Sequence, residues 1–181
     1  MRPAVVRRVE EADAVASTIA VIGSKVPTFV RVEGVMSVGK TPFSMQLAKQ
    51  LRGQLVSSDA FLIGDTSDRA YWDCLHLEKL RDVASALSSR DGPIVFEGIC
   101  SRELLQPEKF GRGYVIYLKR LSFNNPETPE WHEGYWLSGE PPEEEVHKSI
   151  HEYHLRFRPH EDADLILELP EIGHSLRGPI P

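Results

Sequence analysis

The chain of 181 residues has little cysteine, no long apolar run and no excess of basic residues. Its two cysteines, Cys74 and Cys100, lack the spacing of a metal or redox site, which indicates reduced thiols in a cytoplasmic protein. No apolar run approaches the ~20 residues of a membrane-spanning helix, and no apolar signal-peptide segment follows Met1. We therefore expect neither membrane insertion nor secretion.

The net charge is −6 at neutral pH, whereas proteins that bind nucleic acid normally carry a basic surface. We therefore expect no nucleic-acid partner. The negative charge is concentrated in residues 121–150, which hold seven glutamates, one lysine and no arginine. This segment alone carries a charge of −6, so the rest of the chain is neutral overall.

The composition is that of an ordinary folded domain. Hydrophobic residues make up 41% of the chain and charged residues 27%, both typical of globular proteins. A chain of this length can bury a substantial core, and we expect a single domain spanning residues 1–181. The sequence leaves the oligomeric state open, a homodimer included.

One stretch fits the phosphate-loop pattern G-x-x-x-x-G-K-[ST]. It reads Gly34, Val35, Met36, Ser37, Val38, Gly39, Lys40, Thr41. A β-branched run at 29–32 predicts a buried strand before it, and apolar residues recurring from 43 to 51 predict a helix after it. In that context backbone N–H groups wrap a polyphosphate, Lys40 reaches its oxygens and the Thr41 hydroxyl binds Mg²⁺. The alternative is a glycine-rich turn that fits the pattern by chance.

Two acids follow predicted strands. Residues 54–58 predict a strand that leads into Asp59, and residues 94–98 predict one that closes on Glu97. Because the carboxyl ends of parallel strands meet at one edge of a sheet, both acids would face the phosphate loop. Asp59 could accept a proton from a substrate hydroxyl or hold Mg²⁺, and Glu97 could serve Mg²⁺. A structural role as a cap or turn residue stays open for each.

The remaining hydrophobic patterns complete an alternation of strands and helices. They predict helices at 8–24, 75–87 and 143–157, and strands at 114–118 and 163–167. This alternation predicts an α/β protein with a mostly parallel five-stranded sheet and helices on both faces, which is a three-layer α/β/α architecture.

Three blocks of the chain resemble the uridine kinase and phosphoribulokinase-like family of phosphate-loop kinases. They are residues 34–41, residues 56–61 (Val-Ser-Ser-Asp-Ala-Phe) and residues 94–99 (Ile-Val-Phe-Glu-Gly-Ile). In that family the second strand ends in an aspartate followed closely by an aromatic residue, and the third ends in Glu-Gly. Residues 158–166 look like the family's closing strand, so the resemblance spans about residues 28–168.

The resemblance implies a phosphate-loop NTPase fold that uses ATP and Mg²⁺. It implies that the loop and Lys40 bind the nucleotide phosphates, that Thr41 and Glu97 serve the metal, and that Asp59 is the general base beside it. The implied activity is transfer of the γ-phosphoryl group to a small-molecule hydroxyl acceptor, such as a nucleoside, a sugar or a similar metabolite.

One segment departs from the family pattern. Family members follow the fourth strand with a lid rich in arginines, whereas the lid-like insertion at about 121–145 has none. An arginine that clamps the transferring group is worth roughly 10³–10⁵ in rate in related chemistry. Arg156 and Arg158, at the end of the helix predicted before the last strand, are the candidates to supply this positive charge instead of the lid. A second hypothesis therefore stands beside the first: a kinase-like, nucleotide-binding regulatory or scaffold protein with little or no transfer activity.

Two further patterns carry aromatic and imidazole groups. Trp131, Tyr135 and Trp136 predict either a stacking wall for a substrate or an anchor that holds the acidic segment to the core. Three histidines recur at helical spacing and are interpreted as a solvated helix face rather than as metal ligands: His147, His151 and His154.

Overall fold

A computed structural model of the chain describes residues 4–64, 68–88, 92–122, 130–131 and 142–170. No helix among these residues is long and apolar enough to cross a membrane.

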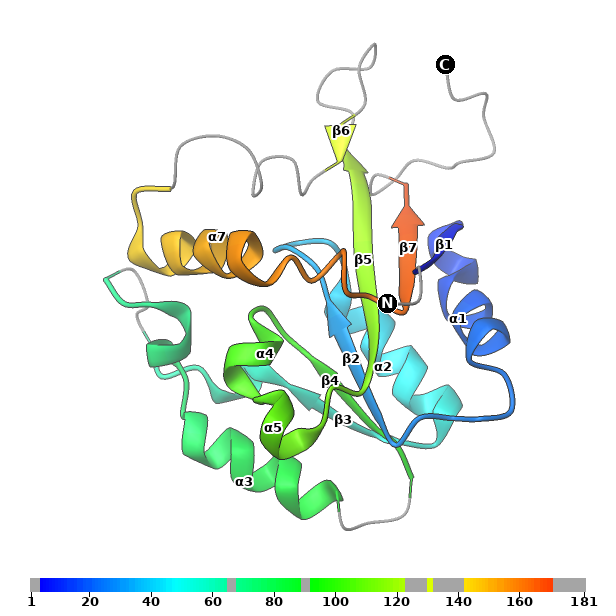
Figure 1. The fold of residues 1–181 in the computed structure, drawn as a ribbon, viewed down its shortest axis with the longest axis horizontal. Helices are drawn as coiled ribbons and strands as arrows, with labels where there is room; N and C mark the ends of the chain where they lie inside the picture. Colours follow the sequence, from blue (N-terminus) through cyan, green and yellow to red (C-terminus); the bar gives the residue numbers. More distant parts are fainter. Residues whose placement is uncertain (1–3, 65–67, 89–91, 123–129, 132–141, 171–181) are drawn as a thin grey trace.

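A twisted sheet forms the centre of the molecule (Figure 1). Its strands lie in the order β1-β7-β5-β2-β4-β3, and every neighbouring pair in this order is parallel. A short strand, β6, pairs antiparallel with the end of β5. The strands are β1 (Val5–Arg8), β2 (Phe29–Glu33), β3 (Gln54–Ser57), β4 (Ile94–Glu97), β5 (Tyr114–Ser122), β6 (Glu130–Trp131) and β7 (Leu165–Leu169).

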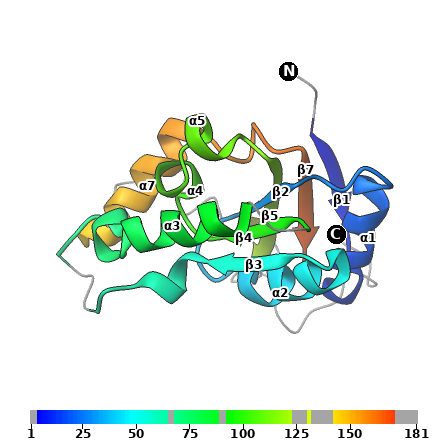
Figure 2. The ribbon, with the colours of Figure 1, turned by 90° about the horizontal axis from the view of Figure 1, so that it is seen from below.

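Helices cover both faces of the sheet, with α1 and α2 on one face and α3, α4, α5 and α7 on the other (Figure 2). They are α1 (Ala14–Ile22), α2 (Lys40–Leu51), α3 (Leu77–Ser88), α4 (Ser101–Leu104), α5 (Pro107–Phe110) and α7 (Glu145–Phe157). Three 3-10 turns join them: η1 (Glu11–Asp13), η2 (Ser58–Phe61) and η3 (Tyr71–Cys74). The predicted three-layer α/β/α architecture is confirmed.

The sheet has six parallel strands in the described part of the chain, one more than the five predicted. The additional strand is β1, which lies at the edge of the sheet with Val5 in register with Leu165 of β7. The prediction of one helix over residues 8–24 is therefore wrong at its beginning, because β1 ends at Arg8 and α1 begins at Ala14. The residues of β1 are exposed and show no alternation of apolar and polar side chains, so their pattern carries no strand signal.

The central strand β2 is buried along its whole length, because β4 and β5 flank it and helices cover it. This burial includes Arg31, which is 1% exposed. Its guanidinium donates hydrogen bonds of 2.7–2.9 Å to four backbone carbonyls: Ser101, Leu105, Gly111 and Arg112. Burial lowers the pKa of Arg31 to about 10, which leaves the side chain charged at neutral pH. Arg31 thereby ties the α4–α5 segment, which the sequence pattern did not predict as helical, to the middle of the sheet.

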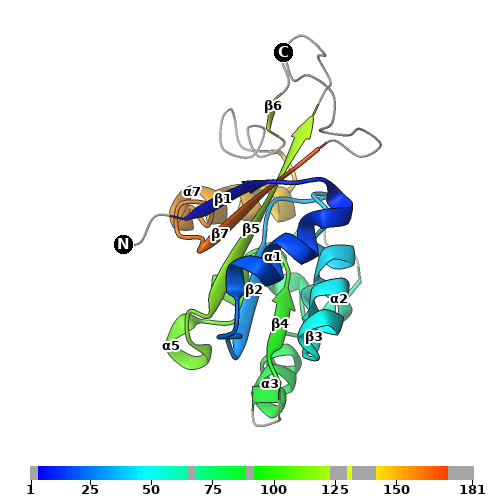
Figure 3. The ribbon, with the colours of Figure 1, turned by 90° about the vertical axis from the view of Figure 1, so that its right-hand side faces the viewer.

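Three strands end side by side. Glu97 at the end of β4 is in register with Val32 of β2 and with Ser57 at the end of β3. β5 continues beyond this edge toward β6 (Figure 3). The candidate site lies at this carboxyl edge, as expected for parallel α/β sheets.

The lid-like insertion expected at about 121–145 lies largely outside the described residues. Tyr135 and Trp136 belong to that part, and of Trp131 the structure describes only the backbone, in β6. Both interpretations of these aromatic residues stay predictions.

Candidate active site

The loop between β2 and α2 has the tight backbone of a phosphate loop. Three of its residues have positive φ angles, 149° at Gly34, 61° at Ser37 and 92° at Gly39. A Cβ atom at Gly34 would lie 2.7 Å from the Leu118 carbonyl oxygen, and one at Gly39 would lie 2.8 Å from Arg120 Nη2. Both glycines are therefore required by their backbone conformation and by the close approach of β5.

Lys40 is the first residue of α2 and is 8% exposed. Its ammonium group donates a hydrogen bond of 2.8 Å to the Val35 carbonyl oxygen, so the side chain folds back over the loop. Burial lowers the pKa of Lys40 to about 8, and the nearby carboxylates of Glu97 and Asp59 oppose that shift. The amine lies beside a helix N-terminus, where free N–H groups and the helix dipole attract anions.

Glu97 joins three elements through one carboxylate oxygen. Its Oε1 accepts a hydrogen bond of 3.2 Å from Thr41 Oγ1, in the first turn of α2, and another from Ser57 Oγ, at the end of β3. These contacts support a role at the phosphate loop, whereas the alternative of Glu97 as a cap of the next helix is not supported, because Cys100 is the N-cap residue of α4. No local pattern in the sequence marks Ser57, because its contact with Glu97 depends on the register between β3 and β4.

Asp59 lies inside η2, directly after β3, and is exposed. The N-cap residue of η2 is Ser57, so the alternative of Asp59 as an N-cap is not supported. Asp59 Oδ1 accepts a hydrogen bond of 3.2 Å from the Tyr71 hydroxyl. The carboxylate is thus held in place and still faces solvent.

An open cavity of about 370 Å³ brings the predicted residues together. Its lining is Met36, Ser37, Gly39, Lys40, Thr41, Pro42, Asp59, Glu97 and Ile99. Two larger hollows lie elsewhere, one of about 640 Å³ at the amino ends of β2 and β4 and one of about 590 Å³ between α1 and α2. No residue of the phosphate loop and neither predicted acid lines those two, so chemistry rather than size identifies the site.

The groups around the cavity fit a magnesium–nucleotide complex. Hydroxyl and carboxylate oxygens of Thr41, Asp59 and Glu97 are the hard ligands that Mg²⁺ prefers, directly or through water. Lys40 and the N-terminus of α2 complement the negative charge of phosphate groups. The donor set therefore suits both parts of the complex.

The structure does not bring Arg156 and Arg158 to this cavity. Both side chains are exposed, and neither lines the cavity. Arg156 forms an ion pair of 2.9 Å with Glu103 of α4, and Arg158 forms one of 3.0 Å with Glu161. These two arginines lie at the C-terminal end of α7 and pair with acids there, so we leave them out of the proposed site.

Arg120, near the end of β5, contacts the phosphate loop instead. It is 4% exposed, and its Nε and Nη2 both donate to the Val38 carbonyl oxygen at 3.1 Å. Nη1 donates to the Pro170 carbonyl oxygen at 2.8 Å, and Nη2 forms an ion pair of 3.3 Å with Glu11. Arg120 supports the loop without lining the cavity. In the sequence it is visible only as a charged residue after a predicted strand.

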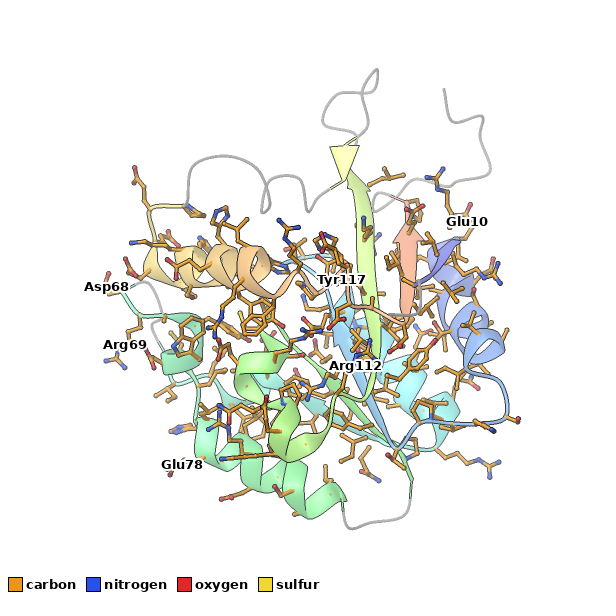
Figure 4. The ribbon with its side chains drawn as sticks, in the orientation of Figure 1. Glu10, Asp68, Arg69, Glu78, Arg112 and Tyr117 are labelled. Atoms are coloured by element: carbon orange, nitrogen blue, oxygen red, sulfur yellow. The ribbon has the colours of Figure 1, made fainter. Side chains whose placement is uncertain are left out.

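The histidines of α7 correct another expectation. His151 and His154 are 5% and 1% exposed, so this part of α7 is not a solvated face. His154 packs edge-on against Tyr153 and against Tyr117, which lies on the side of β5 that faces α7 (Figure 4). Burial, reinforced by the positive charge of Lys40, lowers the pKa of His154 to about 3. No cluster of three or more potential metal ligands occurs among the His, Cys, Asp and Glu side chains that the structure describes.

Comparison with known proteins shows a likeness at the level of the fold. No protein-family model matches the sequence, and no curated protein matches it. Among solved structures, a possible uridine kinase from Bacillus stearothermophilus has a similar fold, with a TM-score of 0.54 and 16% sequence identity. The match covers 86% of this chain and 96% of that protein. The chain therefore shares its overall α/β fold with that protein.

Proposed function

We propose that the protein transfers the γ-phosphoryl group of ATP to a hydroxyl group of a small metabolite, such as a nucleoside or a sugar. The observation that carries the proposal is the convergence of Lys40, Thr41, Asp59 and Glu97 on one cavity of about 370 Å³. A phosphate-binding cation, a metal-binding pair and a solvent-facing base are the groups that phosphoryl transfer requires.

The phosphate loop and Lys40 bind and orient the nucleotide. The ammonium group of Lys40 exchanges the Val35 carbonyl oxygen for phosphate oxygens, which compensate its charge better than a neutral carbonyl does. Thr41 and Glu97 would hold Mg²⁺, which when bound would neutralise charge on the phosphate oxygens. Arg120 keeps the loop in shape through the Val38 carbonyl oxygen.

Asp59 acts as the general base. It accepts the proton of the acceptor hydroxyl while the acceptor oxygen forms its bond to the γ-phosphorus and the bond to the leaving ADP oxygen breaks. The exposed carboxylate at the cavity wall is accessible to such an acceptor.

A nucleotide-binding regulatory or scaffold protein is the second candidate. The observation that favours it is that no arginine lines the cavity among the described residues. Arg69, which follows the segment of Asp59 in the chain, lies at the outer edge of the molecule (Figure 4).

A cytoplasmic location and the absence of a nucleic-acid partner stay predictions.

The test is transfer of radiolabelled γ-phosphate from ATP to a panel of nucleosides and sugars. We expect the wild-type protein to phosphorylate at least one acceptor and Asp59→Asn to lower kcat by about 10²–10⁴ while ATP affinity changes little. Asp68→Asn is the matched control, because Asp68 is an exposed aspartate at the outer edge (Figure 4). ATP binding without transfer to any acceptor, together with an Asp59→Asn variant indistinguishable from wild type, would exclude the kinase and favour the regulatory protein.

A further inference from the structure

Two hydroxyl groups surround one oxygen of the proposed base. The Tyr71 hydroxyl lies 3.2 Å from Asp59 Oδ1 and 2.8 Å from Ser58 Oγ. Ser58 Oγ itself lies 3.4 Å from the same Oδ1. The three groups form a closed triangle at the start of η2.

The direction of these hydrogen bonds follows from counting protons. A carboxylate has none to give, and it is a stronger acceptor than a hydroxyl. Of the two contacts with Asp59 Oδ1, the one from the Tyr71 hydroxyl is shorter than the one from Ser58 Oγ. Tyr71 therefore donates its proton to Asp59 Oδ1, and Ser58 donates to the Tyr71 oxygen. Burial raises the pKa of Tyr71 well above its usual value, so this hydroxyl keeps its proton at neutral pH.

Both donors are fixed by their surroundings. Tyr71 is 5% exposed, and its backbone N–H donates a hydrogen bond of 2.9 Å to Ser149 Oγ of α7. Ser58 is fully buried, and a Cβ atom on Gly98 would lie 2.3 Å from its Oγ. The glycine after Glu97 therefore leaves room for the Ser58 hydroxyl. Such fixed donors can hold an exposed carboxylate in one orientation.

We propose that Tyr71 is a positioning residue, which holds Asp59 Oδ1 so that the second oxygen, Oδ2, faces the acceptor hydroxyl. This inference rests on the proposed kinase function, because it explains how the general base of that reaction, Asp59, is oriented. A base that is free to rotate would spend only part of its time in a reactive orientation, and small misplacements of reacting groups are costly in rate.

The kinetic test uses Tyr71→Phe, which keeps the ring and removes the hydroxyl. With an acceptor that the wild-type protein phosphorylates, we expect kcat to fall about tenfold to a hundredfold while KM for ATP stays within about twofold. In an Asp59→Asn background the same substitution should lower kcat no further, because the base is already lost. Tyr114→Phe is the control, since Tyr114 is a half-buried tyrosine at the beginning of β5, away from the carboxyl edge of the sheet where the site lies. An unchanged kcat in Tyr71→Phe would overturn the positioning role.

A second readout does not depend on transfer. Urea-unfolding midpoints are measured for wild type, Tyr71→Phe, Asp59→Ala and the double variant, and we expect the double variant to lose less than the two single losses combined. Additive losses would overturn the contact itself. If the wild-type protein phosphorylates no acceptor, the proposed function fails, and this cycle alone then decides whether Tyr71 holds Asp59.

Discussion

Lys40 combines a buried amine with a position at the beginning of α2. Burial lowers its pKa from 10.5 to about 8, so the amine is only partly charged at mildly alkaline pH. Phosphate oxygens stabilise the charged form, and nucleotide binding must raise this pKa. Between the two pKa values the complex holds more protons than the free protein, so ATP affinity is full below about pH 8 and falls as pH rises above it.

This linkage is measurable by calorimetry. At pH 9 we expect ATP·Mg²⁺ binding to take up a fraction of a proton, seen as a dependence of the binding enthalpy on the ionisation enthalpy of the buffer. At pH 7 the uptake should fall to about a tenth of a proton, and in Lys40→Met it should be absent at both pH values. Equal proton uptake by wild type and Lys40→Met at pH 9 would show that Lys40 is not the group that takes up the proton.

His154 makes the fold sensitive to acid. Its pKa is lowered from 6.5 to about 3 by burial, so the folded protein binds fewer protons than the unfolded chain between these values. Stability therefore falls as pH drops below 6.5, by about 2 kcal/mol at pH 5 from this one group. We expect urea unfolding of His154→Leu to show a smaller loss between pH 7.5 and pH 5 than wild type does. His76→Leu, which alters an exposed histidine, should lose as much free energy of unfolding between pH 7.5 and pH 5 as wild type does. If His154→Leu also lost as much as wild type, His154 would not be the source of the acid sensitivity.

At the scale of single residues, the sequence predicted what a local pattern carries. Lys40 and Thr41 belong to one contiguous motif, Asp59 follows an apolar strand and Glu97 ends another, so the common edge of a parallel sheet was enough to bring them together. Arg120 contacts Val38, 82 residues away in the chain, and Tyr71 contacts Asp59, 12 residues away and in a different element. No local sequence pattern predicts such contacts.

At the scale of elements, β2 depends on a buried charge. Arg31→Met would leave four carbonyl oxygens in and just after the α4–α5 segment without their donor, and unpaired buried polar groups cost about 1–3 kcal/mol each. We expect a loss of at least about 3 kcal/mol in the free energy of unfolding, measured by urea denaturation. Arg7→Met on the exposed edge strand β1 should cost less than about 0.5 kcal/mol. Similar losses in the two variants would show that the buried hydrogen bonds contribute little.

The accuracy of the predicted elements followed their burial. The largely buried strands β2, β4 and β7 and the helices α2 and α7 left hydrophobic signals, so their positions agree with the predictions within a few residues. The position of β3 agrees as well, although Val56 is its one buried residue. β1 has exposed residues, and α4 and α5 have four residues each, too few for a periodic pattern. Their existence depends on distant partners, β7 for β1 and Arg31 for the α4–α5 segment.

At the scale of the whole molecule, the architecture persists where the sequence does not. A TM-score of 0.54 at 16% identity means that the layered fold is shared with a possible uridine kinase while most side chains differ. A fold of this kind serves many reactions, so function must be argued from the site. Here that site is the carboxyl edge of the sheet, where the phosphate loop, Asp59 and Glu97 meet.

The central claim is that the loop and Lys40 bind the phosphates of a magnesium–nucleotide complex. Isothermal titration of ATP·Mg²⁺ at pH 7 into wild type and Lys40→Ala tests it most directly. We expect saturable binding by the wild-type protein and a loss of affinity of at least about tenfold in Lys40→Ala, because a charge-assisted hydrogen bond to phosphate contributes about 1.5–3 kcal/mol. Equal affinity in the two proteins, or no binding by either, would contradict the claim.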